Sequence, residues 1–412
     1  MHIKELTLYE FDDYASNHPL KSYHQSSSYA LLMSENGYDF DFIGLLDAND
    51  KIVAASLILK KKIALNFFYG YAPKGLLVDY FNENLVEKFI LELKNHYYKK
   101  NMIFIRINPE IAIGELQSDN NYLCKYNENT KIINTFSKFN LKIFNKSENF
   151  ETILPRFNAI VNLKKFDITN IDKTARNKVK KGIRRGLVFE KSTLDNIDIL
   201  YGFIKGMKNR DISYYKSYYN KFNKNDQIDL IYIKISYHDY LVNAQNSYNE
   251  ELEVNNYLNE LFKINQSQDI LNKKMISDKL LTMHEKEIVE ATKCLQNNIT
   301  ETYIAGALVI KYHNRINIVI SGFDKKYKKF NPNHYLYYSI LEHYKKDFSF
   351  ADLNGVTNDF SNKTNYYGLN KFKLEFKPKI YEFIGEADII INEKEYLVLN
   401  KTKVINKLFK KN

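Results

Sequence analysis

The amino-acid sequence predicts a mixed α/β (α+β) fold of two similar domains, with an antiparallel helical hairpin inserted in the second. Two observations favour this class. The order hairpin, helix, strand occurs near both ends of the chain, and a long charged segment without Gly or Pro precedes the second copy. The chain of 412 residues is long enough for more than one domain. Its content of 44 % hydrophobic and 26 % charged residues is typical of globular proteins.

The first copy lies in the N-terminal third of the chain. Residues 39–62 are two apolar segments around a polar turn, which is typical of a β-hairpin. Residues 83–98 place their apolar side chains at helical spacing, so we expect a helix with Asn82 as its N-cap. Residues 102–107 then read as a strand that ends before Pro109.

The second copy lies in the last third. It comprises a hairpin over 302–323, a helix over 333–346 and a strand over 348–353. The repeated order predicts two similar α/β domains, although the copies share little sequence. The cleft between two such domains is a natural ligand site.

The charged segment over 250–298 has helical propensity. Its apolar residues suit two helices broken near 265–270, as in an antiparallel hairpin; a single solvated helix with a frayed middle is the alternative. The predicted units are a first domain of residues 1–155 plus 384–412, a second domain of residues 156–383, and a hairpin of residues 245–299 inserted in the second.

Residues 371–377 alternate between apolar and charged side chains. This period of two predicts a half-buried strand, with Phe372 on one face and Lys373 on the other. On that prediction Lys373 faces either solvent or an anion.

Positive charge dominates the chain. The formal net charge is +11, which favours anionic partners such as nucleic acid, although part of the lysine content is consistent with an AT-rich genome. The charge is densest over 172–192, where a helix would carry Arg176, Lys180 and Arg184 on one face and turn Val179 and Ile183 inward. Such a helix either contacts phosphates or is simply solvated.

Several kinds of chemistry find no support in the sequence. There is no P-loop, no G-x-G triplet and no G-x-S-x-G elbow, and neither the His residues nor Cys124 and Cys294 have metal or redox spacing. We therefore expect no metal and no nucleotide cofactor. With no signal-like segment and no long apolar run, we expect a cytoplasmic protein, for which peripheral contact with the inner membrane face stays open.

Four blocks of the sequence, taken together, resemble a known family. "YAPKGLLVDY" (71–80), "IRINPEI" (105–111), the basic segment and "KFKLEFKPKIYEFIGEAD" (371–388) are similar, in the same order, to blocks of the FemABX family. These are aminoacyltransferases that build the interpeptide bridge of peptidoglycan. The resemblance implies two GNAT-like domains and transfer of an aminoacyl group from charged tRNA to an amine of the lipid-linked precursor's stem peptide. It also implies that no cofactor is used.

The resemblance assigns roles to individual residues. Arg210 and Tyr214 match positions that contact the precursor's diphosphate–sugar portion, and Phe372 and Lys373 match a Phe-Lys pair beside the tRNA acceptor end. The lysine of that pair is thought to support the transition state, so Lys373 is the predicted catalytic residue. The basic segment supplies the predicted tRNA-binding residues: Arg176, Lys180, Lys181, Arg184 and Arg185.

Three positions depart from the family pattern. Tyr29 stands where relatives often have Trp, and Met33 stands where they have a phosphate-binding lysine. Asn108, a predicted substrate-binding residue, replaces an Asp that could accept a proton, and a neutral amide cannot be a general base. Two other functions therefore stay open: an acyl-CoA-dependent N-acyltransferase on the same fold, and a non-catalytic RNA-binding or scaffold protein.

Overall fold

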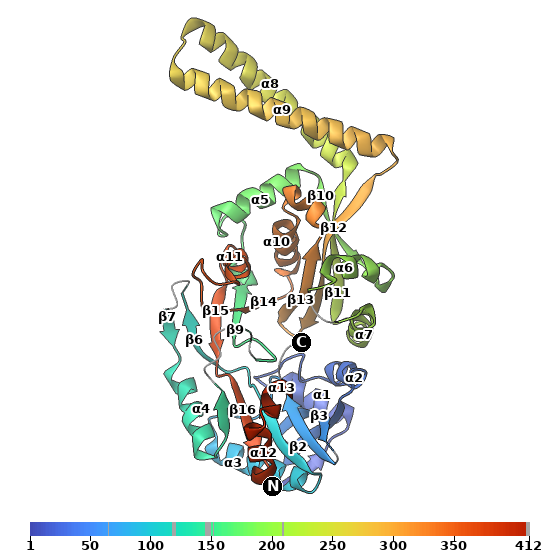
Figure 1. The fold of residues 1–412 in the computed structure, drawn as a ribbon, viewed down its shortest axis with the longest axis vertical. Helices are drawn as coiled ribbons and strands as arrows, with labels where there is room; N and C mark the ends of the chain where they lie inside the picture. Colours follow the sequence, from blue (N-terminus) through green and yellow to red (C-terminus); the bar gives the residue numbers. More distant parts are fainter. Residues whose placement is uncertain (65, 118–120, 145–149, 151, 208–209, 409–412) are drawn as a thin grey trace.

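The chain folds into two units that lie one above the other, with a long helical arm projecting beyond the second (Figure 1). This computed structural model describes all residues except 65, 118–120, 145–149, 151, 208–209 and 409–412. Each unit is organised around one β-sheet covered by helices, which confirms the predicted α/β class.

The first unit contains a seven-stranded sheet in the order β1-β2-β3-β4-β5-β16-β8. Among the described strands of this sheet only β4 and β5 pair in parallel, and helix α3 (Glu83–Tyr98) connects them. The strands are β1 (His2–Glu5), β2 (Asp39–Leu46), β3 (Ile52–Ala64), β4 (Phe67–Ala72), β5 (Met102–Ile107), β8 (Lys142–Phe144) and β16 (Glu386–Ile390), and the other helices are α1 (Leu8–Asn17), α2 (Ser27–Ser34), α4 (Asn127–Lys138), α12 (Glu393–Lys401) and α13 (Val404–Leu408).

The second unit contains a nine-stranded sheet in the order β10-β11-β12-β13-β14-β9-β15-β6-β7. Here β13 and β14 are the parallel pair, and helix α10 (Pro332–Tyr344) connects them. The strands are β6 (Ala112–Leu116), β7 (Tyr122–Lys125), β9 (Phe157–Asn162), β10 (Leu187–Ser192), β11 (Ile228–Ser236), β12 (Glu301–Tyr312), β13 (Arg315–Phe323), β14 (Phe350–Val356) and β15 (Lys379–Phe383). Its helices are α5 (Lys173–Arg184), α6 (Ile197–Ile204), α7 (Ile212–Asn223) and α11 (Tyr367–Leu374), with the 3-10 helices η1 (Leu163–Lys165), η2 (Leu194–Asn196) and η3 (Lys325–Phe330).

The two units share one order of elements. The first runs β1, α1, α2, β2, β3, β4, α3, β5, and the second runs β10, α6, α7, β11, β12, β13, α10, β14, apart from 3-10 helices and the arm. The two predicted hairpins are both present, but they are not counterparts. The hairpin β12–β13 corresponds to β3–β4, because β4 is a further strand between the predicted hairpin 39–62 and the predicted helix 83–98.

The strands of the two sheets are not confined to the predicted domain ranges. Strands β6 and β7 fall within the range 1–155, yet they extend the second sheet through β15. Strand β16 returns to the first sheet beside β5, as its place in the range 384–412 requires. The chain therefore crosses between the two sheets more often than the predicted boundary implies.

The arm consists of helices α8 (Tyr237–Ile264) and α9 (Gln268–Gln296), which lie side by side (Figure 1). The two-helix prediction is confirmed and the single-helix alternative is wrong, since Ser267 caps α9 by accepting a hydrogen bond from the backbone N–H of Ile270. The arm lies between β11 and β12. At the equivalent place in the first unit, β2 and β3 are joined by the short turn 47–51.

Local sequence signals account for α3. Asn82 Oδ1 accepts from the backbone N–H of Leu85 at 3.1 Å, as expected of an N-cap. The predicted apolar face is buried: Leu85, Val86, Phe89, Ile90 and Leu93.

The strand predicted over 371–377 is wrong, because residues 371–374 form the last turn of helix α11 and a turn follows, with Lys377 at positive φ. The alternation of apolar residues also contains an i, i+4 pair: the rings of Phe372 and Phe376 lie 5.5 Å apart and both contact His334 of α10. Packing of this pair against α10 overrides the strand pattern.

A second correction concerns α5, in which Val179 is buried as predicted but Ile183 is 48 % exposed.

Candidate functional site

Asn108 lies where the two parallel strands of the first unit separate. It follows β5, and its Oδ1 accepts a hydrogen bond from the backbone N–H of Lys74, just beyond β4, at 2.7 Å. Asn108 is only 6 % exposed. An amide oxygen is sufficient for this bond, so the neutral residue fits a structural role at the point of separation.

A buried group of charges connects the two units next to Asn108. Glu110, in the loop between β5 and β6, forms an ion pair with Arg315 at the start of β13. Lys74 Nζ lies 3.9 Å from the same carboxylate. Burial alone would raise the pKa of Glu110, but the charges of Arg315 and Lys74 outweigh it and lower that pKa to about 2.

The pKa of a second carboxylate beside Arg315 is shifted in the opposite direction. Asp352 of β14 is 7 % exposed, and its carboxylate accepts a hydrogen bond from Asn158 Nδ2 at 2.8 Å. Burial raises the pKa of Asp352, although Arg315 opposes this shift. Two neighbouring carboxylates with divergent pKa values are characteristic of sites that move protons.

Arg210 and Tyr214 lie where α7 approaches the first unit. Arg210 is exposed, and its guanidinium lies 4.5 Å from the ring centroid of Tyr214. Among the described residues no carboxylate forms an ion pair with Arg210, so Asp211 does not neutralise it; Asp211 instead caps α7. Glu35, at the end of α2, contacts Ser217 and Lys221 of α7. These contacts hold α7 against the first unit at one edge of the junction, the region where the two units meet.

Tyr29 and Met33 lie on α2. The ring of Tyr29 contacts His24 edge-on at 5.0 Å, and the tyrosine is half-buried at the junction. Met33 is buried in an apolar cluster of the first unit, together with Phe11 and Leu57. Met33 is therefore a core residue. A phosphate in this region would have to be bound by other side chains.

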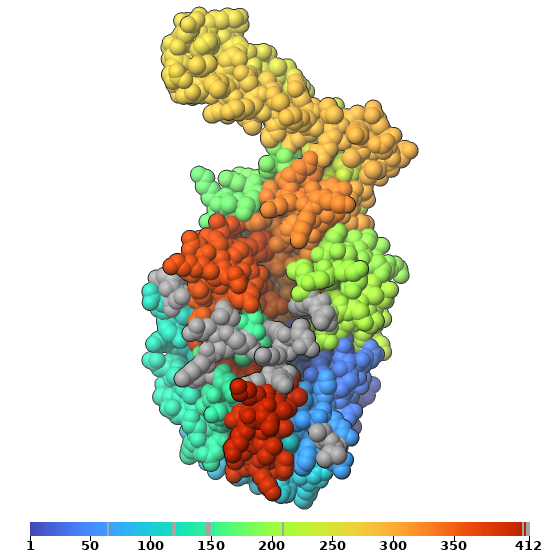
Figure 2. All heavy atoms as spheres, viewed as in Figure 1, coloured from blue at the N-terminus to red at the C-terminus, as the bar shows by residue number. Residues whose placement is uncertain are grey.

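Lys373 is inward-facing on α11. It is 5 % exposed, and its Nζ donates to the carbonyl oxygen of Gly355, near the end of β14, at 2.6 Å. Gly355 is required here, because a Cβ atom would overlap the side chain of Pro155. Phe372 is half-buried against Tyr337. Figure 2 shows the surface recessed between α11 and the α6–α7 pair.

The predicted tRNA-binding residues have unequal exposure. Lys180 is exposed and Lys181 and Arg184 are partly so, whereas Arg176 donates to the carbonyl of Thr169 at 3.1 Å. Arg185 is 6 % exposed and forms an ion pair with Glu287 of the arm. Arg185 therefore has a structural partner and does not lie on the surface that was predicted for it.

The structure brings together some predicted residues and not others. Asn108 lies within the junction, Arg210 and Tyr214 lie at its edge, and Phe372 and Lys373 lie on α11, the helix beside the recess (Figure 2). The basic helix α5 lies further away, beside the arm (Figure 1). Sequence reasoning missed four charged residues of the junction and the amide that bonds to one of them: Lys74, Glu110, Arg315 and Asp352, with Asn158. Lys74 and Glu110 lie within two of the blocks that resemble the family, whereas the contacts of Asn158, Arg315 and Asp352 join residues too distant in sequence to leave a local pattern.

The described residues lack two features. They contain no group of three His, Cys, Asp or Glu side chains placed to hold a metal ion. None of the helices within these ranges is both long and apolar enough to cross a bilayer.

Comparison with known proteins gives a match over nearly the whole chain. The model of the FemAB family matches residues 6–403. A protein of Staphylococcus epidermidis named lipid II:glycine glycyltransferase is 24 % identical, over 97 % of this chain and 95 % of the relative. The protein of the same name from Staphylococcus aureus is 23 % identical, over 98 % and 95 %. The crystal structure of FemX has the same fold, with a TM-score of 0.77 at 20 % identity over 97 % of this chain and 100 % of that one. The chain belongs to the FemAB family.

Proposed function

We propose that this protein is a tRNA-dependent aminoacyltransferase that adds one or more amino acids to the stem peptide of the lipid-linked peptidoglycan precursor, at the cytoplasmic face of the membrane. The observation that carries this proposal is the end-to-end similarity to proteins named for glycine transfer to lipid II. The exposed cations at the junction and on α5 support it, because both substrates contain phosphate.

The reaction is an aminolysis. The amine nitrogen of the precursor attacks the ester carbonyl carbon of aminoacyl-tRNA, a C–N bond forms, and the C–O bond to the ribose breaks. The attacking ammonium must first lose a proton, and the departing ribose oxygen gains one. Because the ester is already activated, the enzyme has to position the substrates, accept a proton and stabilise the oxyanion.

Arg210 suits the diphosphate of the precursor. A guanidinium held over an aromatic ring is preorganised for bidentate contact with phosphate oxygens. Tyr214 holds it there, and the half-buried Tyr29 offers an apolar surface across the junction. In this proposal the residues at the edge of the junction bind the precursor, although Met33 supplies no positive charge for its phosphates.

Lys373 and Asp352 have different roles in the proposed reaction. The ammonium of Lys373, fixed on Gly355, supplies positive charge beside the recess, where Phe372 borders the acceptor end of tRNA. Asp352, three residues before Gly355 on the same strand, takes the proton that Asn108 cannot accept. Its raised pKa favours this role.

The test combines the purified full-length chain, a lipid II analogue and labelled aminoacyl-tRNAs of several kinds. Transfer of label to the stem peptide from at least one of them is the expected result. Absence of transfer from all of them, with both substrates shown to be intact, would reject the proposal. Binding of tRNA without transfer would then favour the non-catalytic function, and binding of acyl-CoA would favour the N-acyltransferase.

A further inference from the structure

Helix α11, which carries Lys373, depends on its neighbours for its position. It has eight residues, and a helix of that length is not stable in isolation. Its buried residues are Asn370 and Lys373. Asn370 fixes the first half of the helix, because its Nδ2 donates to Thr357 Oγ1, just beyond β14, at 2.7 Å. The contacts at the other end of α11 therefore decide where Lys373 lies.

Glu375, directly after α11, makes those contacts. It is 7 % exposed, and its carboxylate accepts hydrogen bonds from Lys178 Nζ of α5 at 3.2 Å and from His334 Nε2 of α10 at 2.8 Å. Its backbone carbonyl accepts from the N–H of Asp172, the N-cap of α5, at 2.8 Å. Burial lowers the pKa of His334 in spite of the bond to Glu375, so the imidazole is uncharged at pH 7 and Lys178 supplies the countercharge.

Aromatic packing supports the same end of the helix. The ring of His334 lies edge-on to Phe372 at 4.9 Å and is stacked with Phe376 at 6.2 Å. Tyr337, one turn later on α10, contacts the same two rings at 4.8 and 5.8 Å. The bond from His334 to Glu375 therefore also sets the ring against which Phe372 packs.

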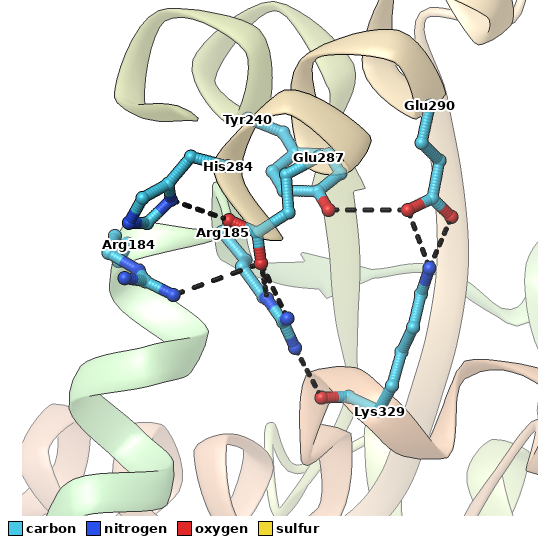
Figure 3. Close-up of polar contacts among 7 residues, drawn as sticks. All are labelled: Arg184, Arg185, Tyr240, His284, Glu287, Glu290 and Lys329. Atoms are coloured by element: carbon cyan, nitrogen blue, oxygen red, sulfur yellow. Dashed lines mark hydrogen bonds and ion pairs between the residues drawn. The ribbon is translucent and has the colours of Figure 1, made fainter. Parts of the chain in front are cut away.

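Helix α5 is itself fixed at its far end, where Arg185 connects it to the arm and to η3 (Figure 3). Arg185 Nε donates to Glu287 Oε1 of α9 at 2.7 Å, and Nη1 donates to the carbonyl oxygen of Lys329 in η3 at 2.5 Å. Breaking a buried pair of this kind would leave an uncompensated charge. Helix α5 therefore keeps one position, and Lys178 is a fixed point for Glu375.

Lys373 and Glu375 hold the end of α11 from two sides. Residues two apart on a helix are separated by about 200° around its axis. Lys373 accordingly extends to β14, where its Nζ donates to the carbonyl oxygen of Gly355, whereas Glu375 extends to α5 and α10. Loss of the contacts of Glu375 would let the helix end shift and withdraw the ammonium from Gly355.

We propose that Glu375 is a positioning residue for the reaction: its contacts with Lys178 and His334 hold α11 so that the ammonium of Lys373 stays in place beside the recess. This inference rests on the proposed function, in which Lys373 supplies positive charge to the reaction. A displacement of about 1 Å in a catalytic arrangement can lower the rate by roughly 10²-fold. Glu375 acts only through Lys373 and contacts neither substrate.

The test follows the accessibility of Lys373 in the full-length protein by acetylation with N-hydroxysulfosuccinimidyl acetate and mass spectrometry. In the wild type Lys373 should react slowly and Lys371, exposed on the same helix, quickly. In Glu375→Gln we expect acetylation of Lys373 to become about tenfold faster, with Lys371 unchanged, because the helix end opens more often. The kcat for aminoacyl transfer should fall about tenfold, with KM for both substrates within about twofold of the wild type.

Glu115→Gln is the matched control. Glu115 is also 7 % exposed and forms an ion pair with Lys379 at 3.0 Å, but it lies on β6, which β9 and β15 separate from β14. Its loss should lower thermal stability, while acetylation of Lys373 and kcat stay within about twofold of the wild type. Lys178→Met removes the countercharge from the α5 side and should also accelerate acetylation of Lys373.

Unchanged acetylation of Lys373 in folded Glu375→Gln protein, or in Lys178→Met if the first variant does not fold, would overturn the inference. Equal losses of kcat in Glu375→Gln and in the Glu115→Gln control would overturn it too. Faster acetylation with unchanged kcat would reject the positioning role, because α11 would then move without consequence for the reaction. If the wild type transfers no aminoacyl group while Glu375→Gln still accelerates acetylation of Lys373, the proposed function fails and the hold of Glu375 on Lys373 stands.

Discussion

The two units hold the ends of their parallel strand pairs through different side-chain contacts. In each, a parallel pair of strands connected by a helix separates near one end, and a side chain bonds to the backbone close to that point. In the first unit the side chain is the neutral Asn108, on the N–H of Lys74. In the second it is the cation Lys373, on the carbonyl of Gly355. Asn108 directly follows β5, whereas Lys373 lies on α11, a helix after β14, so the charged side chain of the second unit comes from an element outside the shared order.

The largest expected effect tests this difference directly. Lys373→Ala should lower kcat for aminoacyl transfer by about 10²–10³-fold, as does removal of an oxyanion-stabilising group elsewhere, with little change in tRNA affinity. Lys371→Ala, two residues away and exposed on the same helix, is the control. Thermal unfolding of both variants identifies loss of fold, and unchanged kcat in a folded Lys373→Ala protein would remove its catalytic role.

The next effect concerns the ion pair that connects the units. Glu110→Gln should destabilise the protein by about 2 kcal/mol at pH 7, because it leaves the partly buried Arg315 without its charged partner. The lowered pKa of Glu110 means that its contribution is present above about pH 4.5 and is lost as the pH falls towards about 2. Urea unfolding of both proteins at pH 7, 5 and 3 should therefore show a difference that shrinks with acid. A difference independent of pH would contradict the pairing.

Asp352→Asn tests the proton acceptor. We expect turnover to fall by about 10²-fold and the remaining activity to lose its dependence on a group with a raised pKa. The measurement is the pH profile of kcat in wild type and variant. A purely structural role would leave the shape of that profile unchanged.

The smallest expected effect is in the first unit. Asn108→Ala should cost roughly 1–2 kcal/mol in the free energy of unfolding, because the buried N–H of Lys74 loses its acceptor. Asn108→Asp retains an acceptor and should restore most of this stability. If Asn108→Asp instead raised kcat strongly, the first unit would carry chemistry as well, and the contrast between the units would fail.

Elements with strong local signals could be predicted from sequence. Helix α3, the hairpins and the two arm helices follow from caps, turns and periodicity. Helix α11 could not, because the spacing of Phe372 and Phe376 fits both a strand and a helix until α10 is packed against it. The candidate site was harder to predict than the helices, because Glu110 contacts Arg315, and Asn158 contacts Asp352, only in the folded protein. Resemblance located Lys373, yet its inward orientation needed the structure.

The place of the arm in the fold has a consequence for how its length can vary. Its two ends leave neighbouring antiparallel strands, with Ser236 opposite Glu301 in register and the N–H of Tyr237 donating to the carbonyl of Thr300 at 2.9 Å. A hairpin of any length can start and finish there without altering the strand pairing beneath it. The length of the arm is thus independent of the strand pairing beneath it, whereas its base has to retain Glu287 as the partner of Arg185.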